Sequence, residues 1–116
     1  MPRFRTILIA DDDPDLTEVI AGGLAEAGYT VLTAPNGYDA IGILADNWIA
    51  LLLTDITMAG IDGFELARQA KVMRPNIKVI YLSGAAVKSD GAVHGPVIQK
   101  PIRIADLLGE VQRQLS

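Results

Sequence analysis

The sequence contains no cysteine, which excludes disulfide bonds and thiolate metal sites and leaves the redox compartment open. It also lacks a long apolar run, because the longest wholly apolar stretch, residues 48–53, is far too short to span a bilayer. Arg3 and Arg5 precede an apolar run of only four residues before acidic residues begin, which is not the pattern of a signal peptide. We therefore expect a soluble, cytoplasmic protein without membrane insertion.

An excess of positive charge is missing as well. The formal net charge is −4, and no basic patch is present that would neutralise nucleic-acid phosphates, which argues against direct nucleic-acid binding. Much of the acid is local, in the segment that holds Asp11, Asp12, Asp13, Asp15 and Glu18. Such a segment suggests a cation site, but it is equally typical of the N-terminus of a helix.

The length of 116 residues and the hydrophobic content of 50% predict one domain, residues 1–116, with its own core and no output domain attached. Its centre is the short apolar run Leu51-Leu52-Leu53-Thr54-Asp55, which is typical of a strand buried on both faces of a parallel sheet. Residues 7–10 have the same character and are followed by Asp11. Two buried strands that both end on aspartate indicate one shared acidic site.

Strand and helix patterns alternate along the whole chain, which predicts an α/β fold with a parallel sheet between two layers of helices. The expected strands are residues 5–10, 29–33, 49–54, 77–82 and 97–99, and the expected helices are residues 14–27, 38–48, 64–73 and 104–115. Any helix within residues 85–95 should be short or irregular. Right-handed crossovers place the carboxyl ends of all strands at one edge of the sheet. This brings together five polar residues: Asp11, Asp12, Asp55, Ser83 and Lys100.

That edge has the composition of a magnesium and phosphate site. Clustered carboxylates repel one another and need a cation, and a site with oxygen ligands alone suits Mg²⁺. A carboxylate can also attack phosphorus to give an aspartyl phosphate. A lysine supplies a compact positive charge for the phosphoryl group, and a serine hydroxyl supplies a hydrogen bond.

These residues, in this order, resemble the receiver domain of bacterial two-component response regulators. Four segments carry the resemblance, which runs from about Arg5 to Leu115: residues 7–13, residues 52–63, Tyr81-Leu82-Ser83-Gly84 and Gln99-Lys100-Pro101. It implies the flavodoxin-like, doubly wound (βα)5 fold with strand order 2-1-3-4-5, of which receivers are a known example.

The resemblance also implies a role for each matching residue. Asp55 would be the phosphoacceptor, supplied by a phosphohistidine on a sensor histidine kinase or hybrid kinase. Asp12 and Asp55 would bind Mg²⁺ directly, Asp11 through water, and Thr57 through its backbone carbonyl. Ser83 would be the hydroxyl switch and Lys100 the partner of the phosphoryl group, with backbone N–H groups of Thr57 and Gly84 completing the cradle. Such a domain catalyses only its own phosphoryl transfer and dephosphorylation, and it signals to a downstream protein partner.

The sequence departs from the family pattern at three places. Ala59 stands where the family usually has proline, which predicts a less rigid loop after the acceptor. Val97 stands where an aromatic switch residue is common. The stretch from Ser83 to Lys100 is several residues short, at the expense of the fourth helix.

Two other functions remain open at this stage. A degenerate receiver would bind partners without phosphorylation. A phosphohydrolase of the haloacid dehalogenase type would use Asp11 as nucleophile and Asp13 as its acidic partner, although Pro14 follows and a cap domain is lacking. We assign Asp13 to helix capping instead, and Asp62-Gly63 to the turn before a helix. Tyr38 and Trp48 are expected in the core.

Overall fold

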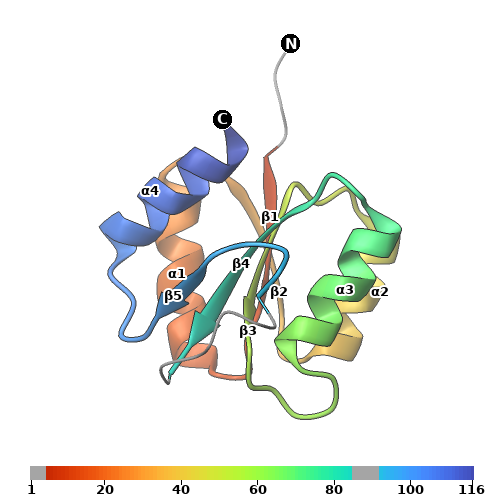
Figure 1. The fold of residues 1–116 in the computed structure, drawn as a ribbon. Coiled ribbons are helices and arrows are strands. Elements are labelled where there is room, and N and C mark those ends of the chain that lie inside the picture. Colours follow the sequence, from red (N-terminus) through yellow and green to blue (C-terminus); the bar gives the residue numbers. More distant parts are fainter. Residues whose placement is uncertain (1–4, 85–91) are drawn as a thin grey trace.

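The computed structural model describes residues 5–84 and 92–116, which form one five-stranded parallel sheet with helices on both faces (Figure 1). The strands are β1 (Thr6–Ala10), β2 (Thr30–Ala34), β3 (Leu51–Asp55), β4 (Lys78–Ser83) and β5 (Val97–Gln99). The helices are α1 (Pro14–Glu26), α2 (Gly37–Asp46), α3 (Gly63–Met73) and α4 (Ile104–Leu115).

The strand order is β2-β1-β3-β4-β5, and neighbouring strands are parallel. This confirms the expected doubly wound, flavodoxin-like topology. The central strand β3 pairs with β1 on one side and with β4 on the other. Asp55, the last residue of β3, therefore lies at the middle of the sheet edge.

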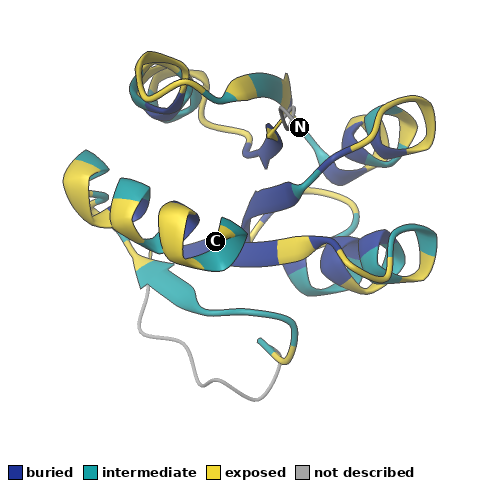
Figure 2. Ribbon diagram, turned by 90° about the horizontal axis from the view of Figure 1, so that it is seen from above, coloured by how far each residue is buried: buried dark blue, intermediate teal, exposed yellow. Residues whose placement is uncertain are grey.

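Successive side chains of each strand point to opposite faces of the sheet, and this divides the core into two layers. Side chains such as Ile7, Leu53 and Leu82 pack against α1 and α4, whereas Leu8, Leu52 and Val79 pack against α2 and α3. Figure 2 shows the strands largely buried between helices whose outer faces are exposed. Because β1 and β3 are buried along their whole length, their residues before the acidic edge are apolar except for Thr6 and Thr54.

The expected elements are confirmed in kind, with ends shifted by one or two residues. One expectation is wrong: Tyr38 is 64% exposed and Trp48 is 63% exposed, so neither belongs to the core. The buried residues of α2 are Gly37, Ala40 and Leu44, and the helix ends at Asp46, before Trp48. The short or irregular helix expected within residues 85–95 falls mainly on residues 85–91, outside the described residues. Residues 92–95 are described and form no helix.

Candidate functional site

The polar residues gather where the strands end, as the topology requires. Asp11 follows β1 directly, Asp55 ends β3, Ser83 ends β4 and Lys100 follows β5. The strand register aligns these ends, because Asp55 lies opposite Leu82 on β4, and Ser83 lies opposite Gln99 on β5. Four segments that are distant in the sequence therefore converge on one place.

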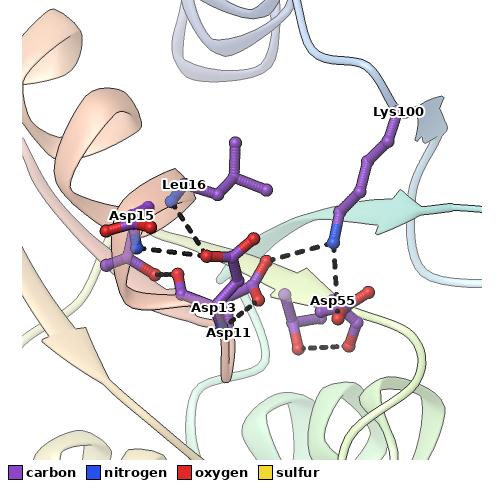
Figure 3. Close-up of polar contacts among 8 residues, drawn as sticks. Asp11, Asp13, Asp15, Leu16, Asp55 and Lys100 are labelled. Atoms are coloured by element: carbon purple, nitrogen blue, oxygen red, sulfur yellow. Dashed lines mark hydrogen bonds and ion pairs between the residues drawn. The ribbon is translucent and has the colours of Figure 1, made fainter.

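The centre of the site is a lysine between two buried carboxylates. Lys100 Nζ lies 3.5 Å from Asp11 Oδ2 and 3.5 Å from Asp55 Oδ2 (Figure 3). Asp11 is 2% exposed and Asp55 is 6% exposed, so both charges are held away from water. Asp12 is exposed beside them, and one carboxylate oxygen from each of Asp11, Asp12 and Asp55 lies within 4.8 Å of the others.

The environment of Asp55 disfavours its negative charge. Burial raises the pKa of the Asp55 carboxyl above its ordinary value, and the neighbouring charge of Asp11 raises it further. The Lys100 ammonium and a hydrogen bond from the Thr57 backbone N–H lower it, but only in part. The positive charge of Lys100 therefore does not fully compensate for the burial of Asp55 and the nearby charge of Asp11.

Asp11 is held in place by its own backbone neighbours. Its N–H donates to the Ala34 carbonyl oxygen at 3.1 Å, and its Oδ1 accepts the Asp13 N–H at 2.9 Å. Its other oxygen, Oδ2, is buried and accepts no hydrogen bond from the described residues. Its charged neighbour is the Lys100 ammonium at 3.5 Å, and the oxygen-only donor set of the site suits a hard divalent ion such as Mg²⁺.

Two aspartates near the site, Asp13 and Asp62, cap helices with their side chains. Asp13 caps α1, because its Oδ1 accepts the N–H groups of Asp15 at 3.1 Å and Leu16 at 3.2 Å (Figure 3). Asp62 caps α3 by accepting the Glu65 N–H at 2.9 Å. The expected capping role of Asp13 is confirmed, and Asp62, expected in the turn before a helix, also acts as the N-cap of that helix. Asp13, which the phosphohydrolase hypothesis pairs with Asp11, is thus committed to the helix.

Lys100 and Ser83 are tied together through the backbone. The Lys100 N–H donates to the Ser83 carbonyl oxygen at 2.7 Å, which fixes the start of the lysine side chain against β4. The peptide bond that follows, Lys100-Pro101, is cis. Ser83 is 4% exposed and Gly84 lies exposed beyond it. Thr57 is exposed in the loop after β3.

Two features of the site are not predicted by the sequence. The Ala34 carbonyl, at the end of β2, supports Asp11. Gly37 and Tyr38, at the start of α2, contact the loop that follows Asp55. The only sequence signal for this contact is the pair of glycines, Gly37 and Gly60, and each of them is equally typical of an ordinary turn.

Comparison with known proteins identifies the family of the chain. The family model of the response regulator receiver domain matches residues 7–112, nearly the whole length. The chain belongs to this family. Its acidic cluster accordingly fits the phosphoacceptor site of a two-component signalling module, and nothing found favours the phosphohydrolase hypothesis.

The chain matches nearly the whole length of one relative and a small part of another. It is 36% identical to the response regulator receiver protein CpdR of Brucella abortus, over 97% of this chain and 98% of that protein. It is 32% identical to the DNA-binding transcriptional regulator NtrC of Salmonella typhimurium over 115 residues, and there it spans only 24% of the relative.

Solved structures show the same fold. A response regulator receiver protein from Sinorhizobium medicae has a TM-score of 0.89 at 33% identity, over 96% of this chain and 94% of that chain. The receiver domain of the hybrid histidine kinase CckA has a TM-score of 0.85 at 33% identity, over 96% and 99%. The response regulator TrrA of Thermotoga maritima, solved in complex with Mg(2+)-BeF, has a TM-score of 0.89 at 29% identity, over 96% and 99%. None of the described helices has the length and apolar character needed to cross a bilayer.

Proposed function

We propose that this receiver domain is phosphorylated on Asp55, with Mg²⁺ held by Asp11, Asp12, Asp55 and the Thr57 carbonyl. The observation that carries the proposal is the placement of Lys100 Nζ at 3.5 Å from both Asp11 and Asp55, next to a cluster of three carboxylate oxygens within 4.8 Å. A structural ion pair needs one carboxylate. Three acidic side chains around one lysine leave negative charge that a divalent cation would balance.

The chain's own residues account for the transfer step. An Asp55 carboxylate oxygen forms the new bond to phosphorus while the bond from phosphorus to the donor imidazole of a phosphohistidine breaks. Lys100 would orient the incoming phosphoryl group and offset its charge, and the Thr57 N–H, which bonds to Asp55, would donate to a phosphoryl oxygen. Mg²⁺, when bound, supplies the additional positive charge that phosphoryl oxygens require.

The Ser83 hydroxyl and the Gly84 N–H would complete the cradle and couple it to the rest of the fold. Ser83 ends β4, and its carbonyl already bonds to the Lys100 N–H, so a movement of Ser83 toward the phosphoryl group reaches β5 directly. Phosphorylation would in this way increase the population of a conformation that already exists. A downstream protein partner would recognise the altered surface built from the last two crossovers.

The phosphodonor would be a sensor histidine kinase or a hybrid kinase in the cytoplasm. The likeness to the receiver domain of the hybrid kinase CckA, and 31% identity over 84 residues to the sensor histidine kinase RcsC of Escherichia coli, support a donor of this class. The domain would catalyse only its own phosphorylation and dephosphorylation.

The test is the Mg²⁺ dependence of phosphorylation by a small phosphodonor, in wild type and two variants. Asp12→Asn removes a metal ligand, and we expect its half-maximal Mg²⁺ concentration to rise by about tenfold or more. Asp46→Asn removes one exposed charge at the end of α2, far from the strand ends, and should behave as wild type. Equal Mg²⁺ requirements in all three proteins would contradict the proposed metal site.

A further inference from the structure

The loop between β3 and α3, residues 56–62, has to be held in place, because its Thr57 backbone contacts Asp55. Its ends are fixed by backbone hydrogen bonds: the Ile56 N–H donates to Leu82 O at 2.9 Å, and the Gly63 N–H donates to Ile56 O at 2.8 Å. Its middle has no proline, since Ala59 stands at that position, and Gly60 has a positive φ of 82°. Something other than a restricted backbone must therefore keep the middle of the loop in place.

Side chains at the start of α2 contact the middle of the loop in a reciprocal way. The Tyr38 ring lies on Gly60, where an added Cβ would be 2.8 Å from Tyr38 Cε2. The Ile61 side chain lies on Gly37, where an added Cβ would collide with Ile61 Cγ1 and be 2.7 Å from Ile61 Cδ1. Each glycine thus accepts a side chain from the other segment. We call these four residues, Gly37, Tyr38, Gly60 and Ile61, the loop clasp.

The exposure of Tyr38 indicates that its ring does not serve the core. It is 64% exposed, although it lies on the first turn of a helix whose other face is buried. The described contact of the ring is with the glycine of the loop. The helix start itself is capped, because Asn36 Oδ1 accepts the Asp39 N–H at 2.8 Å.

The same turn also supports the other side of the acidic site. Ala34, which ends β2 three residues before Gly37, accepts the Asp11 N–H. Residues 34–38 therefore contact the backbone of Asp11 at one end and the loop beyond Asp55 at the other. The turn between β2 and α2 carries none of the proposed catalytic residues, yet it joins the two halves of the site.

We propose that the loop clasp positions the Thr57 backbone beside Asp55, so that Tyr38 and Gly37 are positioning residues for phosphorylation. The proposal rests on the proposed function of Asp55 and adds residues that touch neither the metal nor the phosphoryl group. Misplacing a reacting group by about 1 Å can cost about 100-fold in rate. A loop that is only loosened should therefore slow phosphorylation by about tenfold.

The experiment compares two pairs of variants. Tyr38→Ala removes the ring from Gly60, whereas Tyr38→Phe keeps it. Gly37→Ala pushes Ile61 and the loop away, whereas Gly42→Ala adds the same methyl group to the same helix at a position with nothing within 4 Å. Each protein is measured for the NMR position of the Thr57 amide, for stability in urea and for the rate of phosphorylation by a small phosphodonor with saturating Mg²⁺.

We expect Tyr38→Ala and Gly37→Ala to shift the Thr57 amide and to slow phosphorylation by about tenfold, while Tyr38→Phe and Gly42→Ala match wild type. Tyr38→Ala should do this with little change in unfolding free energy, because Tyr38 is exposed. An unchanged Thr57 amide in both Tyr38→Ala and Gly37→Ala would overturn the loop clasp. If wild type accepts no phosphoryl group, the proposed function of Asp55 fails, but the Thr57 amide still decides whether the clasp positions the loop.

Discussion

Asp55 carries its carboxylate in an environment that disfavours negative charge. It is nearly fully buried, and it lies beside the second buried carboxylate of Asp11, so its ionised form is unfavourable in the absence of a cation. Lys100 and the Thr57 N–H offset this only in part, because the pKa of Asp55 remains raised. A carboxylate in this state gains from any positive charge that enters the site, which is what a metal-dependent acceptor requires.

This raised pKa predicts the pH dependence of the Asp55→Asn variant. Protonated Asp55 stabilises the folded state, and this contribution is complete below the ordinary aspartate pKa of 3.8 and is lost as the pH rises through the raised pKa of the folded state. Asparagine resembles the neutral form at every pH. In a chelating buffer, the variant should therefore match wild type at low pH and become more stable than wild type toward neutral pH.

Urea unfolding between low and neutral pH measures this difference, with the exposed Asp46→Asn as a control for loss of one negative charge. If the difference in unfolding free energy between Asp55→Asn and wild type is largest at low pH and disappears toward neutral pH, ionised Asp55 does not destabilise the folded state. That result would contradict this account.

Residues with charged or hydroxyl side chains at strand ends can be identified from the sequence, whereas residues that act by packing against a distant segment cannot. Asp11, Asp55, Ser83 and Lys100 are recognisable because each follows or ends an expected strand. The sequence misplaces Tyr38 because an aromatic residue on a helix is normally buried, and its partner Gly60 lies 22 positions away across a loop. The hydrophobic periodicity of the sequence does not predict a contact between two segments so far apart.

At the scale of elements, the acidic segment after β1 divides its work between chemistry and helix initiation. Asp11 and Asp12 face the site, while Asp13 caps α1 with two hydrogen bonds. Pro14 occupies the first turn, where its missing N–H costs nothing. At the other end of α1, Gly28 follows the helix with a φ of 103°, a conformation that glycine adopts readily after a helix.

The capping role of Asp13 predicts a loss of stability that does not depend on a metal ion, unlike the roles proposed for Asp11 and Asp12. Asp13→Ala leaves the Asp15 and Leu16 N–H groups without their acceptor and should lower the free energy of unfolding by about 1 kcal/mol. Asp13→Asn retains an acceptor oxygen and should lose much less. Urea denaturation without divalent ions measures both. An Asp13→Ala protein as stable as wild type would show that the cap contributes nothing to α1.

The elements themselves follow from the sequence because apolar periodicity and turn residues agree along most of the chain. The strand ends differ slightly, since a buried run does not mark where its pairing stops: β3 begins at Leu51 rather than at Ile49. The error in α2 has another cause. A stripe of Tyr38, Ile41, Leu44 and Trp48 fits helical spacing. The structure instead buries Gly37, Ala40 and Leu44, so the two sets share Leu44 but differ by one residue in the first turns, where small residues are buried.

At the scale of the whole molecule, topology brings the site together. The order β2-β1-β3-β4-β5 places the ends of β1 and β3 side by side, with β4 and β5 next in line, so Asp11, Asp55, Ser83 and Lys100 meet although they span most of the sequence. This convergence can be predicted, because parallel strands with right-handed crossovers all end at one edge. The distances within the site cannot, because they depend on how the turn before α2 supports Asp11 and the loop after Asp55.

The central claim is that Asp55 accepts a phosphoryl group in the presence of Mg²⁺. The most direct measurement is the intact mass of wild type and Asp55→Asn after incubation with a small phosphodonor and Mg²⁺. We predict one phosphoryl adduct on wild type, its loss when a chelator replaces Mg²⁺, and no adduct on Asp55→Asn. An adduct that persists on Asp55→Asn, or a wild-type protein that binds Mg²⁺ and remains unmodified, would contradict the claim, and the second result would indicate a degenerate receiver that binds its partners without phosphorylation.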